Sequence, residues 1–159
     1  MINVKLIALG NLKEGYLRDA FSEYSKRLGG LCRFEHIELK EHKLPDSPSQ
    51  GEIDAALTDE AKRILALLPT RAYKIALCVE GKQLSSEAFA EKIDKAAASH
   101  NEIIFIIGSS HGLSDSVKSA CDARLSISEM TFPHQLMRVI MAEAIYRALN
   151  ILKGTKYHK

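Results

Sequence analysis

Short apolar runs alternate along the chain with longer segments that carry apolar residues at helical spacing. The runs have strand length and predict strands at 3–9, 33–39, 73–79, 103–107 and 124–128. Between them, one helical stripe is formed by Leu17, Ala20, Phe21, Tyr24 and Leu28. Such patterns predict helices over 13–28, 52–68, from Ser85 or Ser86 to about 99, a short one from 114, and 135–152.

This alternation predicts an α/β domain with a mostly parallel sheet and helices on both faces. The 159 residues suit one domain spanning 1–159, and 46% hydrophobic residues provide a real core. The stretch "KLPDSPSQG" at 43–51 is expected to be a loop. Ligands bind outside the carboxyl ends of such strands, so the loops after Val79, Ile107 and Ser128 are the first places to look for a site.

The stretch "IIFIIGSSHGL" at 103–113 is either a strand followed by an ordinary turn or a strand leading into a ligand loop. Its G-x-x-x-G spacing does not fit the dinucleotide fingerprint, and "EGKQ" at 80–83 lacks the first glycine and the Ser or Thr of a phosphate loop. Small residues nevertheless recur in three loops, at Gly81, at Gly108-Ser109-Ser110, and at Ser126 and Ser128. They would let the backbone approach a flat heterocycle such as adenine without phosphates.

Composition narrows the classes of function. The net charge of +2, the absence of Trp and 6% aromatic residues argue against a platform that stacks single-stranded RNA bases. Cys32, Cys78 and Cys121 form no CxxC pair, which indicates reduced thiols in a cytoplasmic protein, with Cys78 in the core. The six histidines show no metal-ligand spacing, and the apolar start of the chain is too short for a membrane span. We therefore expect no metal and no membrane partner.

The carboxyl-terminal helix is apolar on more than one face. Its main polar residues between 136 and 152 are Arg138, Glu143, Arg147 and Asn150. Such a helix is covered either by a second copy in a symmetric dimer or by burial in the centre of one chain. Glu143 and Arg147 have the spacing of a surface ion pair. The ending "KGTKYHK" either frays or brings Tyr157, His158 and Lys159 to a site.

Three stretches together resemble one family. "FIIGSSHGL", "MTFPHQLMRVIMAEAIYRALNILKG" and the final "YHK" resemble the ribosomal RNA large subunit methyltransferase H family of the SPOUT superfamily. The opening "INVKLIALGNLKEGYLRDAFSEYSKRL" and the central "EGKQLSSEAFA" extend the resemblance over essentially the whole chain. It implies a C-terminal trefoil knot that binds S-adenosylmethionine, a homodimer, and methylation of N3 of a pseudouridine in 23S rRNA of the large subunit.

The resemblance also implies the residues of the cofactor site. The methyl donor would contact Leu77, Gly108, Ile127, Ser128, Glu129, Met130, Thr131 and Phe132. The chain departs from the family at Ser109, where a second glycine is usual. If that position required a positive φ, Ser109 would be strained.

Methyl transfer to N3 needs in-line positioning and a destination for the N3 proton. His134, Arg138, Tyr157 and His158 are the candidate catalytic groups, although His134 also suits the first turn of a helix after Pro133. The tail of one subunit would close over the donor of the other. Because +2 is too little charge for many phosphate contacts, the expected substrate is an assembled ribosome or large subunit. A non-enzymatic nucleotide-binding module and a phosphate-handling enzyme are the alternatives.

Overall fold

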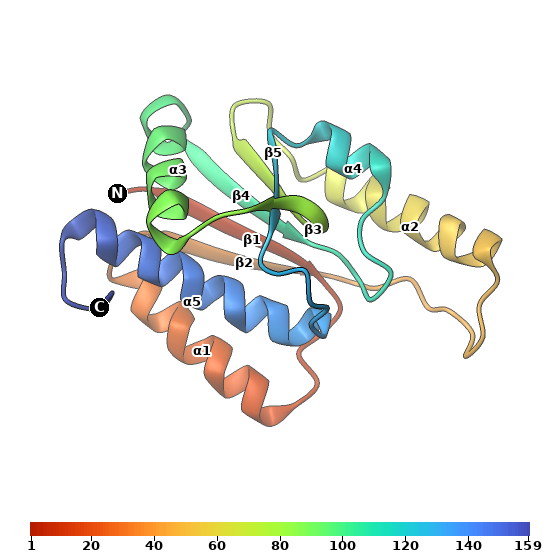
Figure 1. The fold of residues 1–159 in the computed structure, drawn as a ribbon. Helices are drawn as coiled ribbons and strands as arrows, with labels where there is room; N and C mark the ends of the chain where they lie inside the picture. The colour runs from red at the N-terminus through yellow and green to blue at the C-terminus, as the bar shows by residue number, and fades with distance from the viewer.

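A five-stranded sheet forms the centre of the chain (Figure 1). The computed structural model covers residues 1–159. The strand order is β2-β1-β4-β3-β5, and every neighbouring pair is parallel. The strands are β1 (Asn3–Leu9), β2 (Arg33–Leu39), β3 (Tyr73–Gln83), β4 (Glu102–Ile107) and β5 (Ala123–Ser126). The predicted α/β class is confirmed, while the trefoil knot stays a prediction.

Helices cover both faces of this sheet, as the sequence predicted (Figure 1). They are α1 (Gly15–Gly29), α2 (Gln50–Leu65), α3 (Ser86–Ser99), α4 (Asp115–Ala120) and α5 (His134–Lys153). Side chains of β4 alternate between the two sides, with Phe105 in the cluster of α1, α3 and α5 and Ile106 in the cluster that includes α2 and α4. The continuous apolar run of this strand therefore reflects burial on both faces.

Serine caps fix where several helices begin. Ser49 forms a capping box with Glu52, so α2 starts at Gln50, two residues earlier than predicted and inside the predicted loop. Ser85 and Ser114 cap α3 and α4 by accepting from the backbone three residues later.

The third strand is longer than the predicted 73–79. Beyond Leu77 the chain bulges and then pairs with β5 a second time, through Lys82 and Gln83. Gly81 is required there, because a Cβ at this position would lie 2.6 Å from the backbone carbon of Leu125. The "EGKQ" stretch is thus explained by close backbone packing.

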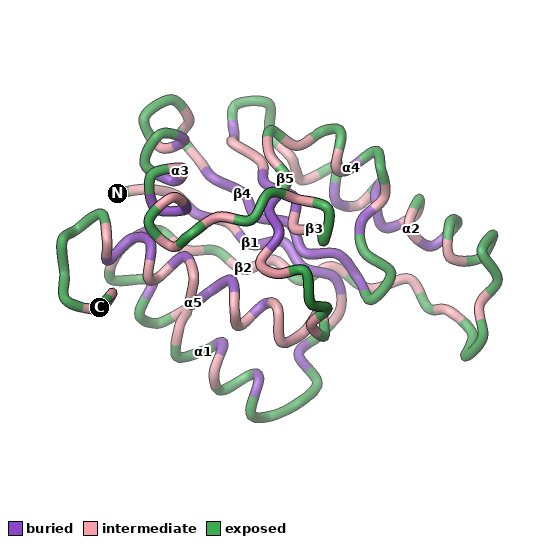
Figure 2. The backbone as a smooth tube through the Cα atoms, viewed as in Figure 1, coloured by how far each residue is buried: buried purple, intermediate pink, exposed green.

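The carboxyl-terminal helix α5 packs against α1 and α3 within the chain. Met141, Ala142 and Ile145 are fully buried in that layer, and Figure 2 shows buried and intermediate stretches along the helix. One chain therefore covers much of the apolar surface that suggested a second copy. No helix combines the length and apolarity needed to cross a membrane.

Candidate active site

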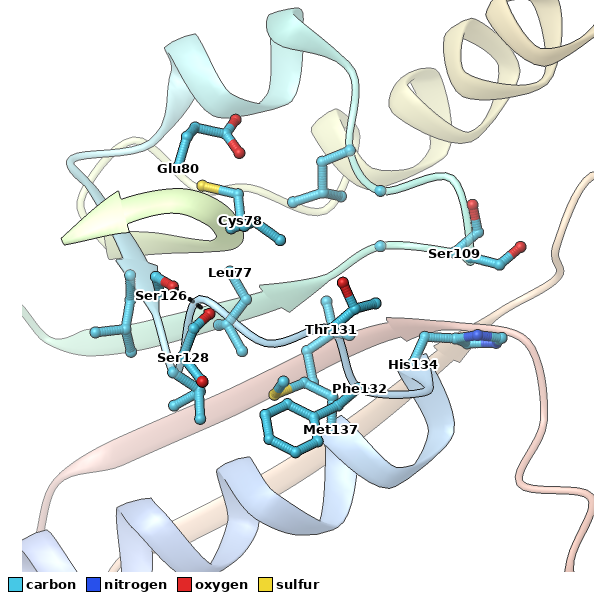
Figure 3. Close-up of a pocket in the computed structure, with 18 of the residues that line it drawn as sticks. Leu77, Cys78, Glu80, Ser109, Ser126, Ser128, Thr131, Phe132, His134 and Met137 are labelled. Atoms are coloured by element: carbon cyan, nitrogen blue, oxygen red, sulfur yellow. Dashed lines mark hydrogen bonds between the residues drawn. The ribbon is translucent and has the colours of Figure 1, made fainter. Parts of the chain in front are cut away.

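A cavity of about 380 Å³ lies where the carboxyl ends of β3, β4 and β5 meet (Figure 3). Its walls come from the bulged part of β3, the loops after β4 and β5, Lys118 of α4 and the start of α5. Seven of the eight predicted donor-contacting residues line it: Leu77, Gly108, Ile127, Ser128, Met130, Thr131 and Phe132. Glu129 does not line the cavity and is exposed. Of the segments singled out by the topology rule, those after β4 and β5 reach this site as loops, whereas β3 contributes residues 77–80 at its bulge instead of a loop after Val79.

Gly108 allows the loop after β4 to fold tightly back on itself. A Cβ at this position would lie 2.3 Å from the carbonyl oxygen of Gly112. The turn is closed by the amide of Gly112, which donates to the carbonyl of Ser109 over 2.9 Å. Gly112 has a φ of +83°, which favours glycine. We call residues 108–112 the glycine loop.

Ser109 is not strained, contrary to the concern raised by the sequence. No residue other than glycine has a positive φ, so this position accepts a side chain. The Ser109 hydroxyl donates to Oε1 of Glu60 over 3.1 Å, and Glu60 is only 3% exposed. The side chain that replaces the usual glycine thus anchors the glycine loop to α2. Sequence patterns gave no sign of this contact, which spans 49 residues.

Two serine side chains shape the loop after β5. The Ser126 hydroxyl donates to the carbonyl of Ser128 over 3.0 Å, a bond drawn in Figure 3. The Ser128 hydroxyl accepts from the amide of Met130 over 3.0 Å. These local bonds hold an irregular turn in place of a regular strand. The exposed position of Glu129 is a departure from the contact set that the resemblance implies.

Cys78 was predicted to lie in the core, and this was wrong. It is half-buried and lines the cavity beside Leu77 (Figure 3). Burial raises the pKa of its thiol, which disfavours the reactive thiolate. Beside it, Glu80 forms an ion pair with Lys118, another residue of the wall. The hydrogen bond from Lys118 is the main reason that the pKa of Glu80 is lowered.

His134 is the candidate catalytic residue that the structure places at the cavity. It is the first residue of α5 and also lines the wall, so both interpretations of its position hold (Figure 3). Burial lowers the pKa of its imidazole below the ordinary 6.5. At neutral pH the ring is uncharged and able to accept a proton.

Arg138 does not reach the cavity, and its predicted contact with substrate does not fit the structure. Its side chain is fully buried and donates to Glu38 over 2.7 Å. It also donates to the carbonyls of Leu9 and Gly10, over 3.2 and 3.0 Å. A buried guanidinium needs such partners, and here they join α5 to the ends of β1 and β2. Arg138 thus supports the helix that presents His134.

Tyr157 and His158 lie at the opposite end of α5 from the cavity, and within one chain the structure does not bring them to His134. The 20 residues of α5 span about 30 Å. The tail does not fray. Tyr157 donates to Oε1 of Glu143 over 3.1 Å, and His158 contacts Oε1 of Glu87 on α3 at 2.7 Å.

The tail also involves the predicted surface pair of α5. The Arg147 guanidinium bonds Glu143, lies over the Tyr157 ring at 4.8 Å and contacts His158 at 3.3 Å. Burial is the main reason that the pKa of Tyr157 rises to about 12, so its hydroxyl keeps its proton at neutral pH.

Comparison with known proteins gives matches over nearly the whole length. The family model described as "Predicted SPOUT methyltransferase" matches residues 2–158. A protein of Streptococcus thermophilus (strain CNRZ 1066) named ribosomal RNA large subunit methyltransferase H is 50% identical, with 99% of this chain and 100% of the relative covered. The protein of the same name in Limosilactobacillus reuteri (strain DSM 20016) is 45% identical with the same coverage.

Among solved structures, the crystal structure of a tRNA (m1G37) methyltransferase from Aquifex aeolicus has the same fold. Its TM-score is 0.57 at 13% identity, with 99% of this chain and 73% of that chain covered. At this identity the likeness concerns the fold alone.

Proposed function

The chain belongs to the SPOUT methyltransferase family, and from that premise we propose that it transfers a methyl group from S-adenosylmethionine to N3 of a pseudouridine in 23S rRNA. The observation that carries the proposal is the single cavity formed by the bulge of β3 and the loops that follow β4 and β5. Seven residues expected to contact the donor meet there although they come from three separate segments.

The size and the lining of the cavity support this donor. Its volume of about 380 Å³ lies within the range of small-molecule sites. Leu77, Leu125 and Ile127 offer apolar surface to a flat adenine, while the tight glycine loop brings backbone groups close. Bound S-adenosylmethionine would supply an activated methyl group on its sulfonium. The protein's part is then to hold the acceptor nitrogen in line with that group and to take up its proton.

His134 is the proposed proton acceptor. His134 lines the cavity, and its lowered pKa keeps the ring neutral at the pH where ribosomes work. Lower pH protonates the ring and removes its ability to accept the N3 proton. Because burial depresses the pKa, this loss begins below the ordinary 6.5.

We therefore expect kcat/KM of the wild type to stay constant near neutral pH and to fall on the acid side below pH 6.5. Replacing His134 by Gln should lower kcat by about 100-fold and abolish the acid limb. The measurement is initial methylation rate against pH at saturating donor. An unchanged acid limb in His134→Gln would assign the titration to another group.

The enzyme is proposed to act as a homodimer in the cytoplasm. In one chain Tyr157 and His158 lie a helix length away from the cavity. In a dimer whose two α5 helices run antiparallel, the tail of one subunit would lie at the cavity of the other. The neutral Tyr157 hydroxyl would then donate to the substrate rather than take a proton from it.

The substrate is proposed to be the assembled ribosome or its large subunit. A net charge of +2 per chain provides few phosphate contacts, so recognition rests on shape. Methyl transfer from labelled S-adenosylmethionine should proceed on ribosomes lacking the modification and be much slower on naked transcript. Equal rates on both would exclude recognition of the assembled particle.

Calorimetric titration with S-adenosylmethionine, with ATP as control, tests the donor first. Binding of the methyl donor alone is expected. Binding of ATP alone would favour the nucleotide-binding alternative and overturn the proposal. Labelled methyl appearing on N3 of the rRNA pseudouridine, located by mass spectrometry, is the expected product, and a methyl at any other site would refute the acceptor.

A further inference from the structure

A second hollow adjoins the donor cavity on the outer side of the glycine loop. It has a volume of about 440 Å³ and lies between residues 41–48, in the loop that follows β2, and the pair Ser110 and His111. In Figure 1 the loop from β2 to α2 runs beside the loop that follows β4. Ser110 and His111 line both spaces, so the two are neighbours on either side of the glycine loop. We call this second space the side groove.

The two walls of the side groove are tied together by one buried carboxylate. Oε1 of Glu60 accepts from the Ser109 hydroxyl over 3.1 Å, and Oε2 accepts from the backbone amide of His42 over 3.0 Å. Glu60 is 3% exposed, so both bonds are shielded from water. The two bonds of Glu60 therefore hold the glycine loop and the loop after β2 at a fixed separation, and this separation sets the width of the side groove.

The side groove is lined by a lysine, two carboxylates and two histidines, which can bind different parts of a ligand. Lys43, Asp46 and His111 are exposed and take no partner within the chain. The His42 ring is held in place by Oδ2 of Asp59 at 2.9 Å. Lys43 is the only fully charged cation among these residues, and it lies beside two carboxylates, Glu41 and Asp46. This charge balance argues against a ligand that carries several phosphates.

This mixture offers one contact for each part of a single nucleotide. An exposed imidazole ring stacks on an unstacked base, and a lysine neutralises one phosphate. Carboxylates accept from ribose hydroxyls and from base N–H groups, including the 2′-hydroxyl that marks RNA.

The side groove also begins at the right place relative to the chemistry. The Oε2 atom of Glu41 would lie 3.0 Å from a Cβ built on Gly10, at the end of β1. The charges of Glu41 and Glu60 both act on the His134 imidazole, raising its pKa against the larger effect of burial. The glycine loop that lines the side groove also lines the donor cavity, whose wall includes His134, so a chain in the side groove lies one loop away from the proposed proton acceptor.

We propose that the side groove binds the RNA nucleotide adjoining the base that is methylated, with Lys43 on its phosphate and His111 against its base. This rests on the proposed function, because it requires an RNA acceptor at the donor cavity. Lys43 and Asp46 lie outside the donor cavity, so their role separates acceptor binding from donor binding.

The test is the double variant K43A/D46A, which leaves the net charge unchanged. We expect KM for the ribosomal substrate to rise about tenfold and Kd for S-adenosylmethionine to stay within about twofold. The slope of log(kcat/KM) against log salt should become shallower by about 0.7–0.9, the effect of one lost phosphate contact. The control is D19A/K26A on α1, where both residues are exposed, and it should behave as the wild type.

The outcomes separate the two proposals. If the wild type methylates its substrate and K43A/D46A matches it in KM and in salt slope, the side groove is not an acceptor site. If K43A/D46A weakens donor binding as much as acceptor binding, the residues support the donor cavity instead, and the inference is again wrong. A wild type without methyl transfer to RNA would refute the proposed function itself.

Discussion

Deleting Tyr157, His158 and Lys159 is expected to lower kcat for methyl transfer by about 100-fold or more. Donor binding should change by less than about twofold, because none of these residues lines the cavity of its own chain and the partner's tail is proposed to contact the acceptor and not the donor. The effect would arise across a dimer, where the partner's tail reaches the acceptor. The measurements are single-turnover methylation and calorimetric donor binding on the same preparation. Full activity of the shortened chain would exclude a catalytic tail.

The deletion also removes packing, so a milder variant is needed beside it. Tyr157 stacks edge-on against Tyr146 with ring centroids 4.7 Å apart and donates to Glu143. Tyr157→Phe keeps the ring and removes only the hydroxyl. Lys159→Ala at the exposed end is the control and should leave activity unchanged. Equal thermal stability of Tyr157→Phe and wild type would assign any loss of kcat to the hydroxyl.

Mixed dimers distinguish action in trans from action in cis. When the tailless chain is co-expressed with a chain whose donor cavity is disabled, half of the dimers are mixed and each has one complete site. Activity should then recover to about a quarter of the wild-type value for a symmetric dimer. No recovery would place the tail's role within its own chain.

Local periodicity was sufficient to predict most of the fold. The strand at 103–107 and the serine caps at Ser85 and Ser114 depend on residues within a few positions of each other. The second pairing of β3 with β5 depends instead on Leu125 lying against Gly81, 44 positions away in the chain. A glycine required by distant backbone looks the same in sequence as a glycine required by a turn, so the extension of β3 was missed.

The residues of the site could be named from the sequence, but the contacts they make with residues far away in the chain could not. The topology rule indicated the loops after β4 and β5. The resemblance supplied the residues, and the structure places Thr131 and Phe132 in the wall while Glu129 is exposed. It gave no indication of the Ser109–Glu60 bond, because the family pattern has no side chain at that position. Arg138 seemed available for substrate because sequence does not show that Glu38 and two strand-end carbonyls already engage it.

Replacing Gly108 by Ala is expected to have the other large effect, a loss of donor binding of about 100-fold. A Cβ at this position would lie 2.3 Å from the carbonyl oxygen of Gly112 and 3.0 Å from Cγ of Leu113. Both neighbours line the cavity, so relieving the clash moves the wall that faces the donor. We expect a loss of stability of about 1–3 kcal/mol as well, because the new methyl group overpacks a closed turn.

Two other glycines serve as controls for this substitution. Gly29 at the end of α1 has no atom within 4 Å of a built Cβ, so Gly29→Ala should retain donor affinity and gain up to about 1 kcal/mol in stability. Gly112 is equally open but has a φ of +83°, so Gly112→Ala isolates backbone strain, about 1–2 kcal/mol, from steric clash.

Donor affinity is measured by calorimetry and stability by urea unfolding. If Gly108→Ala folds and binds S-adenosylmethionine as tightly as Gly29→Ala, the close approach at the glycine loop does not shape the donor site. If Gly108→Ala and Gly112→Ala lose the same affinity for S-adenosylmethionine, the backbone conformation of the glycine loop determines donor binding more than the steric clash at Gly108 does.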